Sequence, residues 1–249
     1  TVPHAHLFFG PKGSANLALA LAFAQYLACV NKQQQDSCGT CPSCVKHLKF
    51  VHPDLHFVFP VAKTSNVKTK PVSKNFLSEW RSLLDENPYF SLFDWLQHIG
   101  VGNKQGIISV EESSNILKDL SLKPYEGEIK IMLIWMPEKM NIQAANKLLK
   151  IIEEPPQKTL FLLVAESTEN MLATVLSRTQ LLKVSRHSDE EVLYYLTNRG
   201  VEQGKAKMIS NLVDGNINEA IQLAEHVEDS EQNALSFVQW MRLCFSALQ

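Results

Sequence analysis

The sequence predicts an α/β fold built on a parallel sheet, followed by a small all-helical region. Up to residue 184, short apolar runs alternate with helical patterns, and only helical patterns follow. Alternation of this kind indicates parallel strands joined by crossover helices. The last three runs are rich in Ile, Leu and Val with little alternation, as expected for strands covered on both faces. The expected strands are residues 6–9, 56–59, 129–135, 159–165 and 181–184.

Three helical patterns lie between these runs. Residues 15–30 are rich in Ala and Leu, and residues 111–120 carry apolar side chains at helical spacing. The third pattern, residues 141–153, begins with the N-cap residue Asn141 and stops before a Pro-Pro pair. Each of the three is therefore expected to be a helix that packs on the sheet.

The region after residue 184 is expected to be helical throughout. Ser188 and Glu191 are spaced as a capping box, which predicts a helix start. Helix breaks are expected at Gly200, Gly204 and Asp214-Gly215. These patterns divide the chain into a core (1–185), a helical region (186–230) and the start of a further helical domain (231–249). Because residues 231–249 are apolar with nothing after them to pack against, and the first strand begins so early, we expect a fragment truncated at both ends.

Composition and charge narrow the function classes. The chain has 45% hydrophobic and 20% charged residues, which is ordinary for a globular protein and excludes wholesale disorder. With 24 basic against 26 acidic residues, a basic field over the whole protein is excluded, although a local basic patch is not. No apolar run reaches the roughly 18 residues of a membrane span, and no signal-peptide pattern is present. We therefore expect a cytoplasmic protein in a reducing compartment.

A polar insert at residues 61–74 interrupts the core pattern. It contains Lys63, Lys68, Lys70 and Lys74, with no aromatic residues between them. Isolated charges of this kind are typical of a solvated mobile loop. A nucleic-acid contact is the alternative.

The cysteines predict a metal site. Four of the five have the spacing Cys29-x8-Cys38-x2-Cys41-x2-Cys44. In a reducing compartment this pattern favours a tetrathiolate zinc site over two disulfides. Four sulfur ligands leave no open position, so the zinc is expected to be structural. The alternatives are buried free thiols, a redox pair of Cys41 and Cys44, or His47 as a competing ligand; Cys244 is expected to be a buried apolar residue.

A phosphate-binding loop is expected at residues 10–17, between the first strand and the first helix, but its chemistry is missing. A functional loop reads G-x-x-x-x-G-K-[ST], with Gly for backbone approach, Lys for the phosphates and a hydroxyl for Mg²⁺. Ala15, Asn16 and Leu17 stand at those three positions, and Lys12 lies in the turn. The residues concerned read Gly10, Pro11, Lys12, Gly13, Ser14, Ala15, Asn16 and Leu17. No ATP is therefore expected to bind.

The end of the strand at 129–135 lacks the acidic residues that an ATPase needs there to hold Mg²⁺ and activate water. Trp135 and Met136 occupy the two positions, and Glu138 is the only acid nearby. The ATPase residues are thus missing at two separate motifs. Chance change in one motif alone does not explain this pattern.

Several motifs together carry a family resemblance. They are Gly10-Pro11-Lys12-Gly13, the segment 139–150 followed by Glu153-Glu154-Pro155-Pro156, the triplet Ser177-Arg178-Thr179, and residues 215–220. On these motifs the chain resembles the delta-prime family of bacterial DNA polymerase III clamp-loader subunits, which have the AAA+ fold. The resemblance implies an AAA+ core (1–185) carrying a zinc module (29–44), a helical lid (186–230) and the start of a collar domain (231–249). Asn218 stands where active relatives carry a sensing Arg.

The resemblance also implies a role. Members of this family are typically inactive ATPases that complete the loader ring and present the Arg of a Ser-Arg-Cys motif to a neighbour's ATP in trans. Here Ser177 and Arg178 match that motif, with Thr179 in place of Cys. A guanidinium at the γ-phosphate stabilises developing charge. For Arg178 the alternative is a surface ion pair at a helix end.

The implied partners are the ATP-binding neighbours and the clamp-opening subunit of the loader, with the sliding clamp and primer-template DNA reached through the complex. No membrane contact is expected, and the isolated chain is expected to be a monomer. Two other functions stay open. One is a divergent but active ATPase in which Lys12 and Glu138 replace the missing groups. The other is a zinc-module nucleic-acid binder. The near-neutral charge argues against it, as does the presence of only Lys46 and Lys49 close to the knuckle formed by Cys38, Cys41 and Cys44.

Overall fold

The structure is a computed structural model, and it describes residues 3–102 and 104–225. The chain divides into two compact units, residues 1–185 and 186–249. The predicted collar segment 231–249 and Cys244 lie outside the described residues. No helix within the described ranges is long and apolar enough to cross a lipid bilayer.

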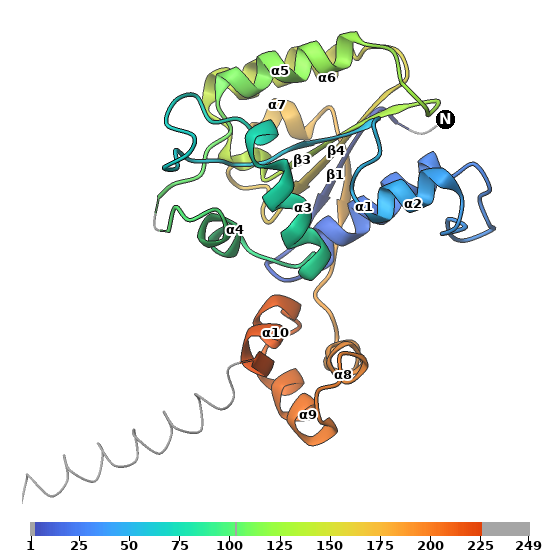
Figure 1. The fold of residues 1–249 in the computed structure, drawn as a ribbon, viewed down its shortest axis with the longest axis vertical. Helices are drawn as coiled ribbons and strands as arrows, with labels where there is room; N and C mark the ends of the chain where they lie inside the picture. The colour runs from blue at the N-terminus through green and yellow to red at the C-terminus, as the bar shows by residue number, and fades with distance from the viewer. Residues whose placement is uncertain (1–2, 103, 226–249) are drawn as a thin grey trace, which may run out of the picture. The chain divides into compact units, whose positions relative to one another are not determined.

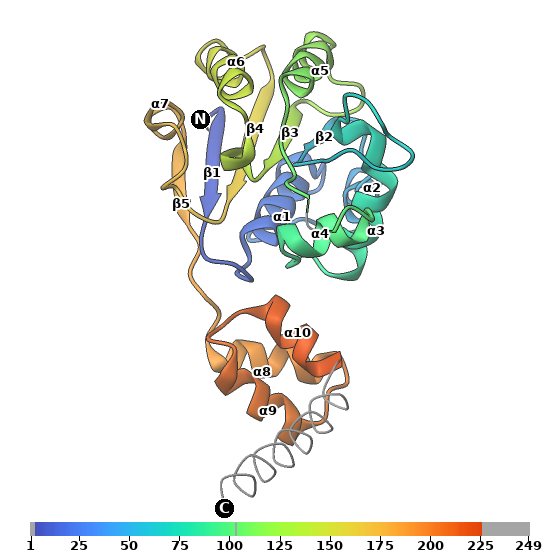
Figure 2. The ribbon, with the colours of Figure 1, turned by 90° about the vertical axis from the view of Figure 1, so that its left-hand side faces the viewer.

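The first unit is a five-stranded sheet with helices on both faces (Figure 1). Every strand pairing is parallel, and the strand order is β2-β3-β4-β1-β5 (Figure 2). The predicted α/β fold with a parallel sheet is confirmed. Its strands are β1 (Ala5–Phe9), β2 (Leu55–Val58), β3 (Lys130–Trp135), β4 (Thr159–Ala165) and β5 (Gln180–Lys183). Its helices are α1 (Asn16–Ala28), α2 (Pro42–Leu48), α3 (Leu77–Glu86), α4 (Leu92–His98), α5 (Val110–Ser121), α6 (Ile142–Glu153) and α7 (Ala173–Leu176), with short 3₁₀ turns η1 (Ser73–Phe76) and η2 (Pro137–Lys139).

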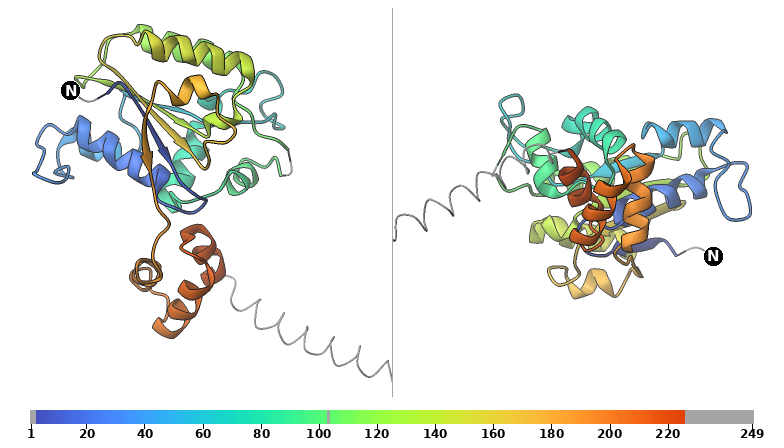
Figure 3. Two further views of the ribbon diagram at one scale, coloured as in Figure 1. Left: turned by 180° about the vertical axis from the view of Figure 1, so that it is seen from behind. Right: turned by 90° about the horizontal axis from the view of Figure 1, so that it is seen from below.

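The sheet separates two apolar clusters, because successive strand residues point to opposite faces. Along β3, Leu133 packs with α1, α3 and α4, whereas Met132 and Ile134 pack with α5, α6 and α7. Figure 3 shows the latter face from behind. Strands β3 and β4 are buried along their whole length, which explains why their sequences show almost no polar alternation.

Strand β5 is not covered in this way. It pairs only with β1, at one edge of the sheet, and Leu181 is 48% exposed. The prediction that both of its faces are covered is therefore wrong. Its short apolar run of two leucines lies between Gln180 and Lys183, which is a composition that an edge strand also tolerates.

The insert at 61–74 is only partly solvated. Val61 is buried and exchanges two backbone hydrogen bonds with Ile107. At the other end Ser73 is fully buried, where its hydroxyl accepts from the Phe59 N–H at 2.9 Å and its own N–H donates to the Glu112 carboxylate at 2.7 Å. The expectation of a solvated loop is therefore wrong at both ends. The hydrogen bonds that bury Val61 and Ser73 join residues far apart in the sequence, so no local pattern predicts them. The four lysines of the insert are exposed as predicted.

The second unit is helical in its described part. Its helices are α8 (Asp189–Asn198), α9 (Gln203–Leu212) and α10 (Ile217–Glu225). The Ser188–Glu191 capping box is confirmed, with the Ser188 N–H donating to the Glu191 carboxylate at 2.8 Å. The predicted break at Gly204 is wrong: Gly204 lies in the first turn of α9, where the Glu202 carboxylate accepts its N–H at 2.9 Å and so caps the helix. Gly215, in contrast, does separate two helices and has a φ of 72°.

Candidate functional site

The turn between β1 and α1 is closed by a side chain at the position where a phosphate loop has its Lys. Asn16 is buried, and its Nδ2 donates to the Gly10 carbonyl at 2.7 Å and to the Ala165 carbonyl at 3.2 Å. Ala165 is the last residue of β4, so this amide ties the turn to the carboxyl end of the sheet. Leu17 is 4% exposed and belongs to the apolar cluster on the α1 face. Both residues that replace the phosphate-binding groups are thus part of the core.

The cavity lined by most of this turn is small. Gly13, Asn16 and Leu17 line a cavity of about 20 Å³, together with Phe90 and Trp135. A cavity of that size holds about one water. Sites for ligands the size of a nucleotide measure roughly 300–1,000 Å³. The turn therefore has the position of a phosphate loop without the space for a triphosphate.

Aromatic packing explains why this cavity is small. Trp135 ends β3 and is 4% exposed. Its ring centroid lies 5.2 Å from that of Trp80 and 5.1 Å from that of Phe90. These side chains come from α3 and from the segment before α4, and no local sequence pattern predicts that they meet at the end of β3.

The acids nearest to this end of the sheet are Glu138 and Glu166. Burial raises the pKa of Glu138 to about 7, and among the described residues its Oε2 has no hydrogen-bond partner. Its Oε1 accepts from the Glu166 N–H at 3.2 Å. Burial also raises the pKa of Glu166, a residue that the sequence reasoning missed although it directly follows β4.

A second, larger cavity lies beside the turn. It measures about 620 Å³ and is lined by Lys12, Glu138 and Lys139, together with apolar side chains from α4. The structure thus brings together Lys12 and Glu138, the two groups on which the divergent-ATPase alternative depends.

Arg178 lies on a compact turn between α7 and β5. Val175 is buried and anchors α7 to the sheet. The Thr179 hydroxyl donates to the carbonyls of Val175 and Leu176, at 3.2 and 3.3 Å, and so holds the end of the helix. Thr179 thereby has a structural role in this turn.

The guanidinium of Arg178 has three partners in its own chain. Its Nη1 donates to the Thr174 carbonyl at 3.0 Å and to the Ser177 hydroxyl at 3.2 Å. Its Nη2 lies 2.6 Å from a carboxylate oxygen of Glu153, the last residue of α6. The side chain is 37% exposed. Geometrically it is the surface ion pair at a helix end that the sequence left open, and it remains accessible to a neighbouring molecule.

Arg178 and the turn at residues 10–17 lie at opposite ends of the strands: the turn is at their carboxyl ends and Arg178 is at their amino ends. Gly10 follows the carboxyl end of β1, whereas Arg178 precedes the amino end of β5. In the parallel β1–β5 register, His6 is opposite Gln180 and Phe9 is opposite Lys183. From His6 to Gly10 the strand direction covers about 13 Å at 3.3 Å per residue, and Arg178 lies in the turn that precedes this stretch. Arg178 therefore cannot serve the turn of its own chain.

The four cysteines gather into one cluster. Cys29 caps the C-terminus of α1, Cys41 caps the N-terminus of α2, and all four Sγ atoms lie within 4.8 Å of one another. Cys38 Sγ is 3.6 Å from that of Cys29 and 3.9 Å from that of Cys44. Four sulfurs bound tetrahedrally at 2.3 Å from Zn²⁺ are about 3.8 Å apart, whereas disulfide sulfurs are about 2.05 Å apart. The cluster fits a tetrahedral thiolate site.

Backbone donors surround these sulfurs. The N–H groups of Cys38, Cys41 and Cys44 each donate to the preceding cysteine's sulfur, at 3.3–3.4 Å. Backbone donors lower the pKa of Cys38 to about 6, whereas burial raises the pKa of Cys44 to about 12. A bound cation deprotonates such a thiol outright, so the donor set suits Zn²⁺. The ring of His47 instead lies against that of His52, with centroids 4.5 Å apart, and His47 is outside the cluster.

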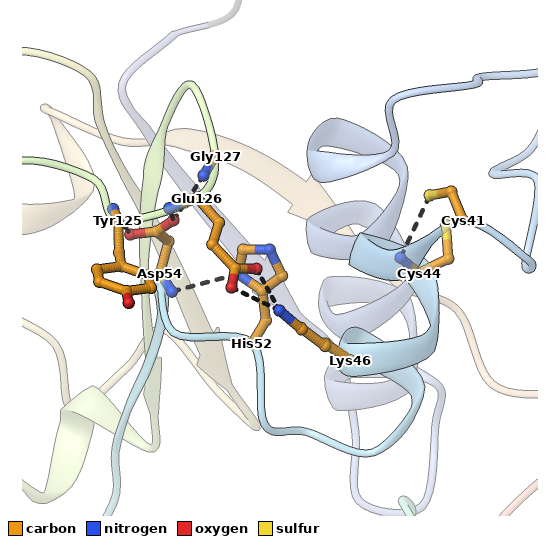
Figure 4. A network of polar contacts seen from close by, with 8 residues as sticks. All are labelled: Cys41, Cys44, Lys46, His52, Asp54, Tyr125, Glu126 and Gly127. Carbon is orange, nitrogen blue, oxygen red and sulfur yellow. Dashed lines mark hydrogen bonds and ion pairs between the residues drawn. The ribbon is translucent and has the colours of Figure 1, made fainter.

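The cysteine module is joined to the sheet by a polar network (Figure 4). Lys46 on α2 contacts the Glu126 carboxylate at 2.5 Å. The Asp54 carboxylate accepts backbone N–H groups from Tyr125, Glu126 and Gly127, at 2.5–2.9 Å. Burial acts to raise the pKa of Asp54, but these donors outweigh it and lower that pKa. The sequence does not predict this network, because its partners lie 71–80 residues apart.

Asn218, at the predicted position of the sensing Arg, lies on α10 in the second unit. It is 8% exposed. A buried amide here offers no cation to a phosphate.

Comparisons with known proteins identify the family. Residues 1–188 match the family described as "DNA polymerase III, delta subunit". The chain is 26% identical over 231 residues to DNA polymerase III subunit delta' of Bacillus subtilis (strain 168), a match that covers 93% of this chain and 56% of the relative. It is 30% identical over 177 residues to the subunit of the same name from Yersinia pestis, with 70% of this chain and 39% of the relative covered.

Among solved structures, the Holliday junction branch migration motor RuvB of Thermotoga maritima has 15% identity and a TM-score of 0.48, over 90% of this chain and 54% of that one. This score is too low to carry an argument. The chain spans about half, or less, of the length of the curated relatives named above. The match to the family profile runs through the whole first unit and carries the assignment: the chain belongs to the DNA polymerase III delta subunit family.

Proposed function

We propose that the chain is a non-hydrolysing subunit of the DNA polymerase III clamp loader in the bacterial cytoplasm. Its role is to complete the ATP-driven ring and to present Arg178 to the ATP of a neighbouring subunit. One observation carries this proposal: the two sites differ in how open they are. The turn at residues 10–17, where a nucleotide would bind, has a cavity of only about 20 Å³, whereas Arg178 lies exposed at the opposite end of the strands.

The mechanism follows from the chemistry of the guanidinium. Charge that develops on a transferring phosphoryl group is stabilised by an Arg contact, which is worth roughly 10³–10⁵ in rate in related systems. Arg178 stands on a turn held by Val175 and Thr179, so little side-chain and backbone freedom remains to be lost when it meets a phosphate. Ser177 assists by accepting one guanidinium N–H at 3.2 Å.

The cysteine cluster is proposed to hold a structural zinc ion through Cys29, Cys38, Cys41 and Cys44. Its four sulfurs leave no position for substrate. The ion would hold the loop between α1 and α2 in one conformation. The Lys46–Glu126 ion pair would in turn hold α2 against the segment that precedes β3. Since Glu126 neutralises Lys46, a nucleic-acid role for this module has little support.

The proposed partners are the ATP-binding neighbours and the clamp-opening subunit, with the sliding clamp and primer-template DNA reached through them. A loader reconstituted with this chain tests the proposal. With Arg178→Ala, ATP hydrolysis stimulated by DNA should fall while the ring still assembles. Unchanged hydrolysis in an intact ring would refute the role of Arg178.

One observation supports a second candidate, the divergent ATPase. Lys12 and Glu138 line a common cavity of about 620 Å³, which is large enough for a nucleotide. Against it, the described residues that line this cavity include no Ser, Thr or Tyr hydroxyl to hold Mg²⁺. Calorimetric titration of the chain with ATP and Mg²⁺ separates the two candidates, because micromolar binding would favour the ATPase.

A further inference from the structure

The ion pair between Glu153 and Arg178 occupies the guanidinium that the proposed function assigns to a neighbour's phosphate. We propose that Glu153 is a positioning residue that holds the Arg178 guanidinium until a phosphate of the neighbouring subunit displaces it. This inference rests on the proposed function and names a competitor within the same site.

The geometry gives the guanidinium one charged partner. Nη2 lies 2.6 Å from the Glu153 carboxylate, whereas Nη1 bonds only to neutral oxygens of Thr174 and Ser177. All of these partners belong to Arg178's own chain. A phosphate that approaches Nη2 therefore meets the Glu153 carboxylate, and its displacement changes the charge beside the guanidinium.

Helix stability does not explain an acid at this position. Glu153 is the last residue of α6, where the macrodipole is negative and a carboxylate is unfavourable. Glu154 follows at the cap and adds a second negative charge. The carboxylate of Glu153 is thus favourable to the fold chiefly through its contact with Arg178.

The exchange is energetically easy. The Glu153 and Arg178 side chains are 44% and 37% exposed, and exposed pairs of this kind shift an equilibrium by at most about fivefold. A phosphate carries more charge than a carboxylate and can accept two parallel N–H bonds from an arginine. It would therefore displace Glu153, but the displaced carboxylate would stay nearby and repel it. Glu153 lowers the apparent affinity of the assembled site for the triphosphate without removing the stabilising group.

The test is ATP hydrolysis by the reconstituted loader as a function of ATP concentration. Glu153→Gln removes the charge and keeps the size of the side chain. We expect the apparent KM for ATP to fall by up to about fivefold at low salt, with kcat within about twofold. Glu154→Gln is the matched control, since it removes the charge of another exposed glutamate one residue away, and it should behave as the wild type.

A double variant separates this inference from the proposed function. With Arg178→Ala as background, Glu153→Gln should have no further effect on KM. If Arg178→Ala alone leaves hydrolysis unchanged, the proposed function fails. If Arg178→Ala lowers hydrolysis but Glu153→Gln leaves KM unchanged or raises it, or if its effect persists without Arg178, only the role of Glu153 is refuted.

Discussion

Restoring the phosphate-loop residues should damage the fold without restoring nucleotide binding. The perturbation is the double variant Asn16→Lys with Leu17→Thr, which puts a Lys and a hydroxyl at the positions where a functional loop has them. Asn16 would lose its hydrogen bonds to the carbonyls of Gly10 and Ala165, at 2.7 and 3.2 Å. An ammonium group would instead face a cavity of about 20 Å³.

The magnitude follows from these contacts. Two hydrogen bonds at about 0.5–1.5 kcal/mol each, and a buried Leu replaced by a smaller polar residue at about 2–3 kcal/mol, give a loss of roughly 3–6 kcal/mol in the free energy of unfolding. For a unit of this size that corresponds to a Tm lower by roughly 10 °C or more. Thermal denaturation followed by circular dichroism measures the change.

Calorimetric titration with ATP and Mg²⁺ on the same variant should show no binding. Lys12→Ala is the control: its side chain is exposed, so its Tm should stay near that of the wild type. A double variant that is as stable as the wild type and binds ATP at micromolar concentration would refute the reasoning, because the cavity would then not be what prevents binding.

Two further predictions concern the module and its attachment. Cys44→Ser should lower the zinc content from one ion per chain to well below one and should lower the Tm, because binding to structural sites is coupled to folding; full zinc occupancy measured by mass spectrometry would contradict the four-sulfur assignment. Asp54→Asn should lower the free energy of unfolding by about 2–4 kcal/mol at pH 7, since a charged acceptor of three backbone N–H groups is lost. Because the folded-state pKa of Asp54 lies below its ordinary value of 3.8, its stabilisation is present above that pH and is lost as the pH falls through the lowered pKa. Chemical denaturation at several pH values should therefore show the two proteins converging at acidic pH, and a constant difference would contradict the assignment.

The sequence predicts those parts of the molecule that depend on local patterns. Each predicted strand falls within two residues of an observed one, since buried parallel strands are short apolar runs bounded by polar residues. The cysteine cluster follows from spacing alone, and Asn141 caps α6 as its residue type predicts, with its side chain accepting from the Ala144 N–H at 2.7 Å.

The remaining features depend on contacts between distant segments. Nothing near Trp135 in the sequence indicates that Phe90 lies against it and lines the small cavity at the turn of residues 10–17. The pairing of Arg178 with Glu153 likewise joins two helix ends that are separated by a strand. The exposure of β5 was missed for the same reason, because a short apolar run does not say whether a strand has one neighbour or two.

The central claim is that this chain acts on ATP that it does not itself bind. The most direct measurement is DNA-stimulated ATP hydrolysis by the reconstituted loader carrying Arg178→Ala in this subunit, with ring assembly checked by native mass spectrometry. Arg199→Ala, an exposed arginine of the second unit, is the control. The account predicts that hydrolysis falls severalfold or more in an intact ring with Arg178→Ala and is unchanged with Arg199→Ala. Equal hydrolysis by the Arg178→Ala loader and the wild type would contradict it.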